Sequence, residues 1–443
     1  MLLLQQILFI LLVAFSVYLF SRKVKEISAN IKLGHDEDLS ENKKERWKNV
    51  LLLALGQKKM FRYPLVGVIH FVIYAGFVII NIEILEIILD GIFGTHRMFA
   101  DTLGGFYTFV IDFFELLALG VLLACVIFLI RRNILKLKRF VNRDLDGWPH
   151  TDANLILITE IILMGLFLTM NSADRALQLQ GSPHYADHGN FIISGLLANS
   201  LQHLNSNTLV GIERTCWWLH ITGIFAFLNY LPYSKHFHIL LAFPNTYYKP
   251  LQPKGEMKNM KNVQQEVSYI FKPELAPANG EDQTQNAVAT KFGAKDIFEL
   301  SWKNLLDAYT CTECGRCTAA CPANITGKLL SPRKIMMDTR DRMEDVRKNI
   351  KENGSFKDDG KTLVHDYITV EELRACTSCN ACVEECPVSI SPLSIIFELR
   401  RSLVMEESNA PAEWNAMFSN IENNFAPWKF SPDERDKWAE EME

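Results

Sequence analysis

The sequence predicts an all-α protein: a five-helix transmembrane bundle followed by a cytoplasmic helical domain with eight clustered cysteines. Three observations support this fold class. Five apolar stretches are long enough to cross a bilayer, the segments between them differ sharply in positive charge, and eight of the 10 cysteines fall into two copies of one spacing. The net charge of -5 argues against a nucleic-acid partner, because domains that bind nucleic acid are usually basic.

The five apolar stretches are predicted to be membrane spans. A bilayer core about 30 Å thick needs roughly 20 mostly apolar residues per spanning helix. The stretches that meet this requirement are about 2–20, 65–89, 104–130, 153–170 and 209–232. Segments 21–64 and 131–152 carry most of the intervening Lys and Arg, so the positive-inside rule places both in the cytoplasm. We therefore expect a bacterial inner-membrane protein with a periplasmic N-terminus and residues 244–443 in the cytoplasm.

Two segments of the N-terminal half need separate interpretations. A cleaved signal peptide is the alternative for residues 1–20, but the positive charges follow the apolar run and no basic region precedes it. Residues 46–61 (RWKNVLLLALGQKKMF) are typical of an amphipathic helix at the cytoplasmic interface.

The change in composition along the chain divides it into four parts. We predict a membrane domain at 1–243, a polar connector at 244–300, a cysteine-bearing domain at 301–410 and a partner-docking tail at 411–443. Within the connector, residues 276–287 have the polar composition of a flexible segment.

Both cysteine motifs have the spacing C-x2-C-x2-C-x3-C-P, in 311-CTECGRCTAACP-322 and 376-CTSCNACVEECP-387. In two-cluster ferredoxins, the fourth cysteine of each such motif binds the cluster held by the other motif. One [4Fe-4S] cluster is therefore predicted at Cys311, Cys314, Cys317 and Cys386, and the other at Cys376, Cys379, Cys382 and Cys321. A pair of four-cysteine zinc sites is the alternative, but such sites usually show two C-x-x-C pairs.

The sequence around the motifs indicates which ferredoxin fold to expect. Residues 333–350 lie between the motifs and 393–407 follow the second, and both have helical periodicity. This pattern resembles the helical ferredoxin domain of the iron–sulfur subunits of succinate dehydrogenase and heterodisulfide reductase. The two remaining cysteines, Cys125 and Cys216, lie in or beside spans and are interpreted as small apolar fillers.

Three histidines in or beside the spans are candidate cofactor ligands. His70 and His238 are expected at the cytoplasmic side of antiparallel helices, an arrangement that suits the two axial nitrogens of a b haem. His220 precedes His238 by eighteen residues, which is five turns or about 27 Å if the helix is unbroken, so it serves the outer side. Interfacial histidines without a metal are the alternative.

The five-span plan and the H-x17-H pattern, with P-[FY]-S-[KR] between the histidines, resemble the cytochrome b gamma subunit of respiratory nitrate reductase. In that family the second span carries two histidines ten residues apart, and His70 matches the first of them. Ile80 stands where the second would be. The resemblance implies one haem b at His70 and His238 and leaves a second haem open. His220 then contacts a quinone carbonyl or binds haem with a replacement partner such as His96.

Five acidic residues lie in or beside the outer halves of the second and third spans: Glu83, Glu86, Asp90, Asp112 and Glu115. Carboxylates inside a membrane are costly and are functional candidates by default. Because quinone chemistry moves protons with electrons, we expect these acids and His220 to serve an outer quinone site. The alternative is that Glu86 and Asp90 are interfacial caps.

Taken whole, the chain resembles membrane iron–sulfur oxidoreductases that join a nitrate-reductase-gamma-like cytochrome to a dicluster ferredoxin. The stretches 90–97, 311–333 and 412–428 carry the resemblance. These proteins are related to heterodisulfide reductase subunits and to membrane oxidoreductases that accept electrons from electron-transfer flavoprotein. Many continue into cysteine-rich CCG domains, and no CCG sequence occurs here. We therefore expect a separate CCG-domain iron–sulfur subunit as a partner.

The resemblance implies the electron-transfer subunit of a quinone-linked respiratory oxidoreductase. It passes electrons between a cytoplasmic donor, two [4Fe-4S] clusters, haem b and the quinone pool. No catalytic acid pair, activated nucleophile or phosphate-binding glycine loop is evident, so substrate chemistry is assigned to a partner such as electron-transfer flavoprotein. The alternatives are a membrane subunit of a heterodisulfide reductase-like complex and a membrane-bound redox sensor without quinone activity.

Overall fold

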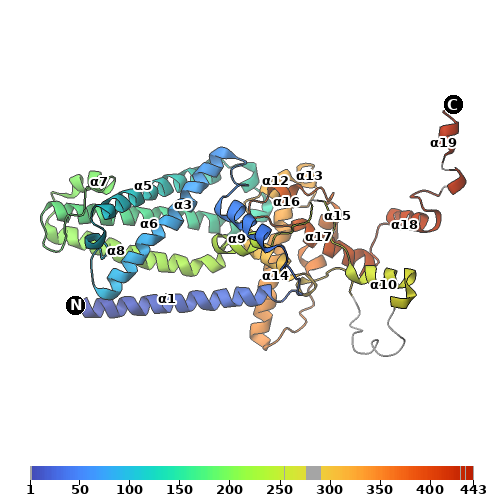
Figure 1. The fold of residues 1–443 in the computed structure, drawn as a ribbon, viewed down its shortest axis with the longest axis horizontal. Coiled ribbons are helices and arrows are strands. Elements are labelled where there is room, and N and C mark those ends of the chain that lie inside the picture. Colours follow the sequence, from blue (N-terminus) through green and yellow to red (C-terminus); the bar gives the residue numbers. More distant parts are fainter. Residues whose placement is uncertain (1, 254, 276–290, 430, 435, 443) are drawn as a thin grey trace.

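The computed structural model describes residues 2–253, 255–275, 291–429, 431–434 and 436–442. These residues form helices and connecting loops, with two isolated β-bridges and no β-strand within the described ranges. The predicted all-α class is confirmed. Figure 1 shows the long helices of the N-terminal half on one side and the shorter cysteine-bearing helices on the other. The connector residues 276–287 lie outside the described residues.

The helices of the N-terminal half are α1 (Leu2–Ile31), α2 (Lys43–Asn49), α3 (Pro64–Phe93), α4 (Ala100–Leu103), α5 (Gly105–Leu129), α6 (Trp148–Leu179), α7 (Ser194–Leu201), α8 (Ser206–Tyr230) and α9 (His238–Tyr247). Those that follow are α10 (Lys261–Phe271), α11 (Trp302–Thr310), α12 (Arg316–Ala320), α13 (Pro322–Ile325), α14 (Pro332–Asn353), α15 (Val370–Arg374), α16 (Ala381–Glu385), α17 (Pro392–Arg401), α18 (Ala412–Asn424) and α19 (Lys437–Glu440).

The N-terminal bundle contains four helices, α1, α3, α5 and α6, that are long and apolar enough to cross a membrane. These four helices indicate a membrane-anchored protein. The predicted fifth helix is present as α8, which packs against α6 and α1. It is less apolar than the other four because it contains Glu213, Arg214 and His220.

The bundle helices extend beyond the apolar runs that predicted them. α1 continues to Ile31, and α6 spans Trp148–Leu179 where the sequence predicted about 153–170. The last turns of α6 are polar yet buried, because side chains such as Asn171 and Asp174 hydrogen-bond within the bundle. The predicted span ends where these polar residues begin, although the helix continues to Leu179.

Two local predictions differ from the structure. The helix from His220 to His238 is broken: α8 ends at Tyr230, and short 3₁₀ turns that include Pro232 lead to α9. Proline lacks the backbone N–H that an unbroken helix needs. The predicted interfacial helix at 46–61 is also shorter, since α2 passes into a π-helix (Val50–Leu55) that stops before Gln57, whose φ is 47°.

The helices after each cysteine motif begin at a Ser-Pro pair. Ser331 caps α14 by accepting a hydrogen bond from Lys334 N, and Ser391 caps α17 in the same way from Ser394 N. Proline is favoured at the first helical position, where its missing N–H has no partner to lose. α14 contains the predicted 333–350 helix. α17 continues as a π-helix (Ser402–Glu406) and covers nearly all of 393–407.

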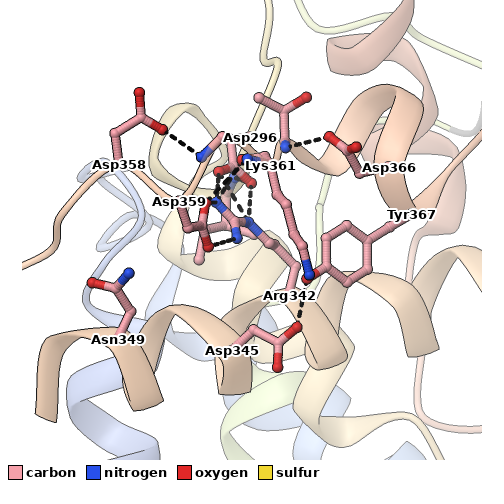
Figure 2. Close-up of polar contacts among 12 residues, drawn as sticks. Asp296, Arg342, Asp345, Asn349, Asp358, Asp359, Lys361, Asp366 and Tyr367 are labelled. Carbon is pink, nitrogen blue, oxygen red and sulfur yellow. Dashed lines mark hydrogen bonds and ion pairs between the residues drawn. The ribbon is translucent and has the colours of Figure 1, made fainter. Parts of the chain in front are cut away.

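Arg342 of α14 ties down the long segment between the two motifs (Figure 2). Its guanidinium is fully buried and lies 2.7 Å from Asp296 Oδ2 and 2.6 Å from Asp359 Oδ2. It also donates a hydrogen bond to the carbonyl oxygen of Lys361. The two carboxylates compensate for the buried charge, so residues 359–361 are packed against α14.

The two halves are joined along the ends of the bundle helices. The fully buried Arg333 of α14 contacts Asp144, in the loop between α5 and α6, at 2.5 Å. α1 reaches α11 through a 2.6 Å hydrogen bond from Asn30 to Tyr309 Oη. α7 lies at the opposite end of the bundle (Figure 1). Segments 32–63 and 130–147 therefore share one end of the bundle with the cysteine-bearing half.

The C-terminal tail projects away from the body of the protein (Figure 1). α18 has no buried residues, and Trp414, Phe418 and Ile421 are exposed along it.

Candidate functional site

The two cysteine motifs fold into matching loops. In each, the residue before the second cysteine and the residue after it have positive φ: Glu313 and Gly315 in the first motif, Ser378 and Asn380 in the second. A short helix then carries the third cysteine, α12 in the first motif and α16 in the second, and these helices pack together. The left-handed residues bend each loop tightly, so that backbone N–H groups reach sulfur, as from Ser378 N to Cys376 Sγ at 3.4 Å.

Five thiols from the two motifs line one cavity: Cys311, Cys314 and Cys317 of the first motif, and Cys382 and Cys386 of the second. Cys386 therefore lies with the first three cysteines of the other motif, and Cys382 borders the same cavity. Ile390 N donates to Cys386 Sγ at 3.2 Å. Within the described residues, no three His, Cys, Asp or Glu side chains are placed to hold a single metal ion. The thiols of the cavity surround a space and do not converge on the position of a single ion.

The predicted second group also combines thiols of both motifs. Its members are Cys321, Cys376, Cys379 and Cys382. Burial raises the pKa of the Cys382 thiol to about 12, with added contributions from the neighbouring Cys376, Cys321 and Cys379. Cys379 is exposed, whereas Cys321 and Cys382 are buried. The second group is therefore the one that opens to solvent.

Burial also raises the pKa of Cys311 and of Cys386 to about 12. Free thiols at these positions stay protonated at neutral pH, and a bound cationic centre is what favours their thiolate form. This donor set fits an iron–sulfur cluster in the first cavity. The other two cysteines, Cys125 in α5 and Cys216 in α8, are buried in the core of the bundle.

The first thiol group lies against the membrane half. Glu313, between Cys311 and Cys314, is buried and forms ion pairs with Lys235 and with Arg340. Burial alone would raise the pKa of Glu313, but these two cations hold it below its ordinary value. Lys235 lies in the turn between α8 and α9. The loop around the first cavity is thus held by the turn that precedes His238.

His70 and His238 lie at this same end of the bundle, close enough to interact electrostatically with each other. His70 Nδ1 is 3.1 Å from Gln57 Oε1, and His238 Nδ1 is 3.0 Å from the carbonyl oxygen of Lys235. Both partners are acceptors, so each Nδ1 carries the proton and each Nε2 keeps its lone pair. Histidine ligands of metals typically make this hydrogen bond through their second nitrogen. Each histidine of the pair therefore keeps one nitrogen able to bind a metal.

A third histidine, His236, joins this pair and was missed in the sequence analysis. Its ring centroid is 5.6 Å from that of His238, and its buried Nε2 has no hydrogen-bond partner within the described residues. His236 and His238 bracket Phe237 in an H-x-H sequence, which was a visible signal. The prediction used only the spacing between His220 and His238 and did not include His236.

His220 lies apart, within α8. Its Nδ1 is 3.0 Å from the carbonyl oxygen of Leu163, and its buried Nε2 has no partner within the described residues. His96, the suggested replacement partner, instead packs against Tyr185 with ring centroids 5.0 Å apart and lies 3.6 Å from Asp174.

Most of the acids in α3 and α5 act as anchors for loops of the bundle. Asp90 accepts hydrogen bonds from the backbone N of Arg97 and of Met98, and Glu86 accepts from Phe99 N and Tyr107 Oη. Asp112 and Glu115 accept from backbone N–H groups of residues 192–194. Glu83 differs from these four acids: it is buried, and its Oε2 has no hydrogen-bond partner within the described residues.

Comparison with known proteins identifies the cysteine-bearing region. Residues 310–390 match the family model of the 4Fe-4S dicluster domain. The chain is 28% identical over 464 residues to the probable iron-sulfur-binding oxidoreductase FadF of Bacillus subtilis, covering 98% of this chain and 61% of that protein. It is 25% identical to the EtfAB:quinone oxidoreductase of Syntrophomonas wolfei, covering 88% of this chain and 53% of that protein. It therefore spans somewhat more than half the length of these two relatives.

A third match is shorter. The chain is 32% identical over 113 residues to one subunit of the ferredoxin/F(420)H(2)-dependent CoB-CoM heterodisulfide reductase of Methanosarcina acetivorans, covering 26% of this chain and 56% of that protein. No solved structure matches the chain at a significant level. The chain thus carries a 4Fe-4S dicluster domain behind a membrane-type helical region and is homologous to iron–sulfur oxidoreductases.

Proposed function

We propose that this chain is the electron-transfer subunit of a membrane quinone-linked respiratory oxidoreductase. It passes electrons between a cytoplasmic donor or partner subunit, two [4Fe-4S] clusters, haem b and the quinone pool. One observation carries the proposal: the turn that holds His238 through the Lys235 carbonyl also pairs with Glu313, between two cysteines of the first cavity. The cluster residues and the histidine pair are therefore neighbours.

The two thiol groups have different environments, which supports an order of transfer. The second group includes the exposed Cys379 beside the exposed Thr377, so it is the group that a soluble donor approaches. The membrane half covers the first group. Lys235 pairs with Glu313, and Asp144 pairs with Arg333 of the dicluster domain. When bound, the clusters and the haem would carry single electrons. Lys235, Arg333 and their partners would hold the first cluster in place and exclude water from it.

The topology belongs to the same proposal. We place five spans in the membrane, with α8 as the fifth, the N-terminus in the periplasm and the cysteine-bearing half in the cytoplasm. The shared end of the bundle supports this, because both Lys- and Arg-rich segments lie beside the cysteine-bearing half. At the opposite end, Glu83 is the acid available to exchange a proton with quinone, since the other four acids hold loops.

The aligned relatives support the choice of partners. A protein named EtfAB:quinone oxidoreductase aligns over 88% of this chain, which favours an electron-transfer flavoprotein or a similar flavoprotein as donor. A separate CCG-domain iron–sulfur subunit remains the other proposed partner, with the exposed tail around Trp414 as its docking site.

A heterodisulfide reductase-like role is the second candidate, because part of the chain aligns with one component of such an enzyme. That likeness covers 26% of this chain, whereas the two oxidoreductases align over both halves. The name of that enzyme gives ferredoxin and F(420)H(2) as electron donors and a heterodisulfide as acceptor. Steady-state assays with a disulfide acceptor and with a quinone acceptor separate the two candidates.

The test is a spectroscopic and chemical inventory of the purified full chain in detergent. We expect about eight irons per chain and a reduced-minus-oxidised difference spectrum with b-type bands, quantified as a pyridine haemochrome. Reoxidation of the dithionite-reduced protein by a menaquinone analogue should follow. Zinc in place of iron would refute the cluster assignment. Iron without haem and without reoxidation by quinone would favour a redox sensor.

A further inference from the structure

Lys59 belongs to the membrane half but contacts a cysteine of the dicluster domain. It lies in the turn between the π-helix Val50–Leu55 and α3. Its Nζ donates hydrogen bonds to the carbonyl oxygens of Val383, at 3.2 Å, and Cys386, at 3.1 Å. Cys386 is one of the two thiols of the second motif that line the first cavity. A positive charge therefore contacts the backbone of a residue whose thiol borders the first cavity.

The same turn also holds the first motif. Arg316, between Cys314 and Cys317, donates from Nη1 to the carbonyl oxygen of Lys59 at 3.4 Å. Its guanidinium lies 5.0 Å from the ring centroid of Tyr63. On the other side, Arg62 forms a 2.7 Å ion pair with Glu385. Segment 59–63 thus contacts both motifs where they meet at the first cavity.

Two residues before Lys59, the chain reaches the histidine pair. Gln57 is buried, has a φ of 47°, and holds His70 Nδ1 through its Oε1. A non-glycine residue keeps this backbone conformation only where its surroundings hold it there. One short turn therefore fixes a candidate haem ligand with Gln57 and the carbonyl of a cluster cysteine with Lys59.

The second thiol group has a cation of a different origin. Arg400 of α17 donates from Nη2 to the carbonyl oxygens of Cys376, at 2.5 Å, and Leu373, at 2.6 Å. Each thiol group thus has one cationic side chain on the carbonyl of one of its cysteines. For the second group this cation belongs to the dicluster domain itself, and for the first it comes from the membrane half.

We propose that Lys59 is a positioning residue for the first cluster, which raises that cluster's reduction potential and fixes it against the His70 side of the bundle. Reduction adds a negative charge to a cluster, and a nearby cation stabilises the charged product. Net charge and hydrogen bonding around the sulfurs are recognised determinants of cluster potential. The inference rests on the proposed function only in taking both thiol groups to hold clusters.

The test is a redox titration of the full chain, followed by electron paramagnetic resonance, for three single variants. Lys59→Gln should make one of the two midpoint potentials more negative and leave the other at its wild-type value. Arg400→Gln should shift the opposite cluster. Lys58→Gln is the matched control, because Lys58 is the exposed neighbour of Lys59 and its replacement removes the same charge from the same turn. It should shift neither potential.

Several outcomes would overturn the inference. If Lys59→Gln shifted neither potential, shifted both equally or acted on the same cluster as Arg400→Gln, Lys59 would not set the first cluster. A Lys59→Arg variant, which keeps the cation, should restore the wild-type potential; a structural role alone predicts no such rescue of potential. Iron content is measured on every sample. Absence of iron from the wild-type chain would refute the proposed function itself, and this result is distinct from iron-loaded variants with unshifted potentials.

Discussion

Replacing Arg333 with methionine tests how the dicluster domain is seated on the membrane half. Arg333 is fully buried and donates from Nε and Nη2 to the two oxygens of Asp144, at 3.0 and 2.5 Å. It also donates from Nη1 to the carbonyl oxygen of Arg139 at 3.0 Å. Methionine fills much of the same space but leaves the Asp144 carboxylate without its cation.

The expected cost follows from this geometry. Removing one partner of a buried ion pair costs about 3–5 kcal/mol, because the other charge is left unpaired in a poorly solvated place. Ser331 Oγ still donates to Asp144, which places the loss toward the lower end of that range. At about 1.4 kcal/mol per factor of ten, the opening equilibrium of this interface should rise by about 10²-fold.

Amide hydrogen exchange of segment 138–146 measures this opening directly. Arg333→Met should accelerate exchange there by about two orders of magnitude, whereas Lys48→Ala, which removes the exposed Lys48–Glu45 pair, should leave it near wild type. The double variant Arg333→Met/Asp144→Leu should recover most of the protection, because no unpaired charge remains. Less than tenfold acceleration, or a double variant no better protected than the single one, would refute the reasoning.

Three further predictions concern the site. Gly315→Ala should destabilise the dicluster domain by more than the roughly 1 kcal/mol expected of Asn380→Ala, measured by denaturant unfolding. Both positions have positive φ, but a Cβ at Gly315 would also lie 2.9 Å from the carbonyl oxygen of Arg139. Glu83→Gln should lower quinone-linked turnover with little change in melting temperature, and turnover equal to wild type would exclude the proton role. Asp90→Asn should instead lower the melting temperature, because it weakens the hydrogen bonds that anchor the loop. Cys386→Ser should reduce iron from about eight to about four per chain, and loss of all iron would show that the clusters assemble together.

The order of helices and cysteine motifs along the chain could be predicted from the sequence, because it depends on repeating local patterns. Apolar runs of bilayer length predicted the bundle helices, and helical periodicity predicted α14 and α17 on either side of the second motif. The repeated cysteine spacing identified a dicluster domain before any coordinates, as the matched family model confirms. Patterns of this kind depend on covalent spacing and on hydropathy, and both are properties of the chain alone.

The contacts between the halves depended on tertiary structure. The sequence offered Lys59 as one of many cations in segment 21–64, which the positive-inside rule treats as interchangeable, and gave no partner for Lys235 or Arg333. The fold gives each a partner in the other half: Lys59 contacts the Cys386 carbonyl, Lys235 contacts Glu313, and Arg333 of the dicluster domain contacts Asp144 of the membrane half. Such pairings join residues far apart along the chain, so no local pattern encodes them.

The intramembrane acids and histidines show the same division. Spacing along a helix predicted that Glu83, Glu86 and Asp90 share a face. Only the packed loops decide that Asp90 is an anchor and that one oxygen of Glu83 has no partner among the described residues. Likewise, the eighteen residues from His220 to His238 imply one helix until the chain turns at Pro232. The sequence by itself determined the helices and the dicluster motifs. The side of the membrane and the cysteine ligands of each cluster stay predictions from it. The tertiary structure decided which charges meet, because burial and hydrogen bonding are settled between segments and not within them.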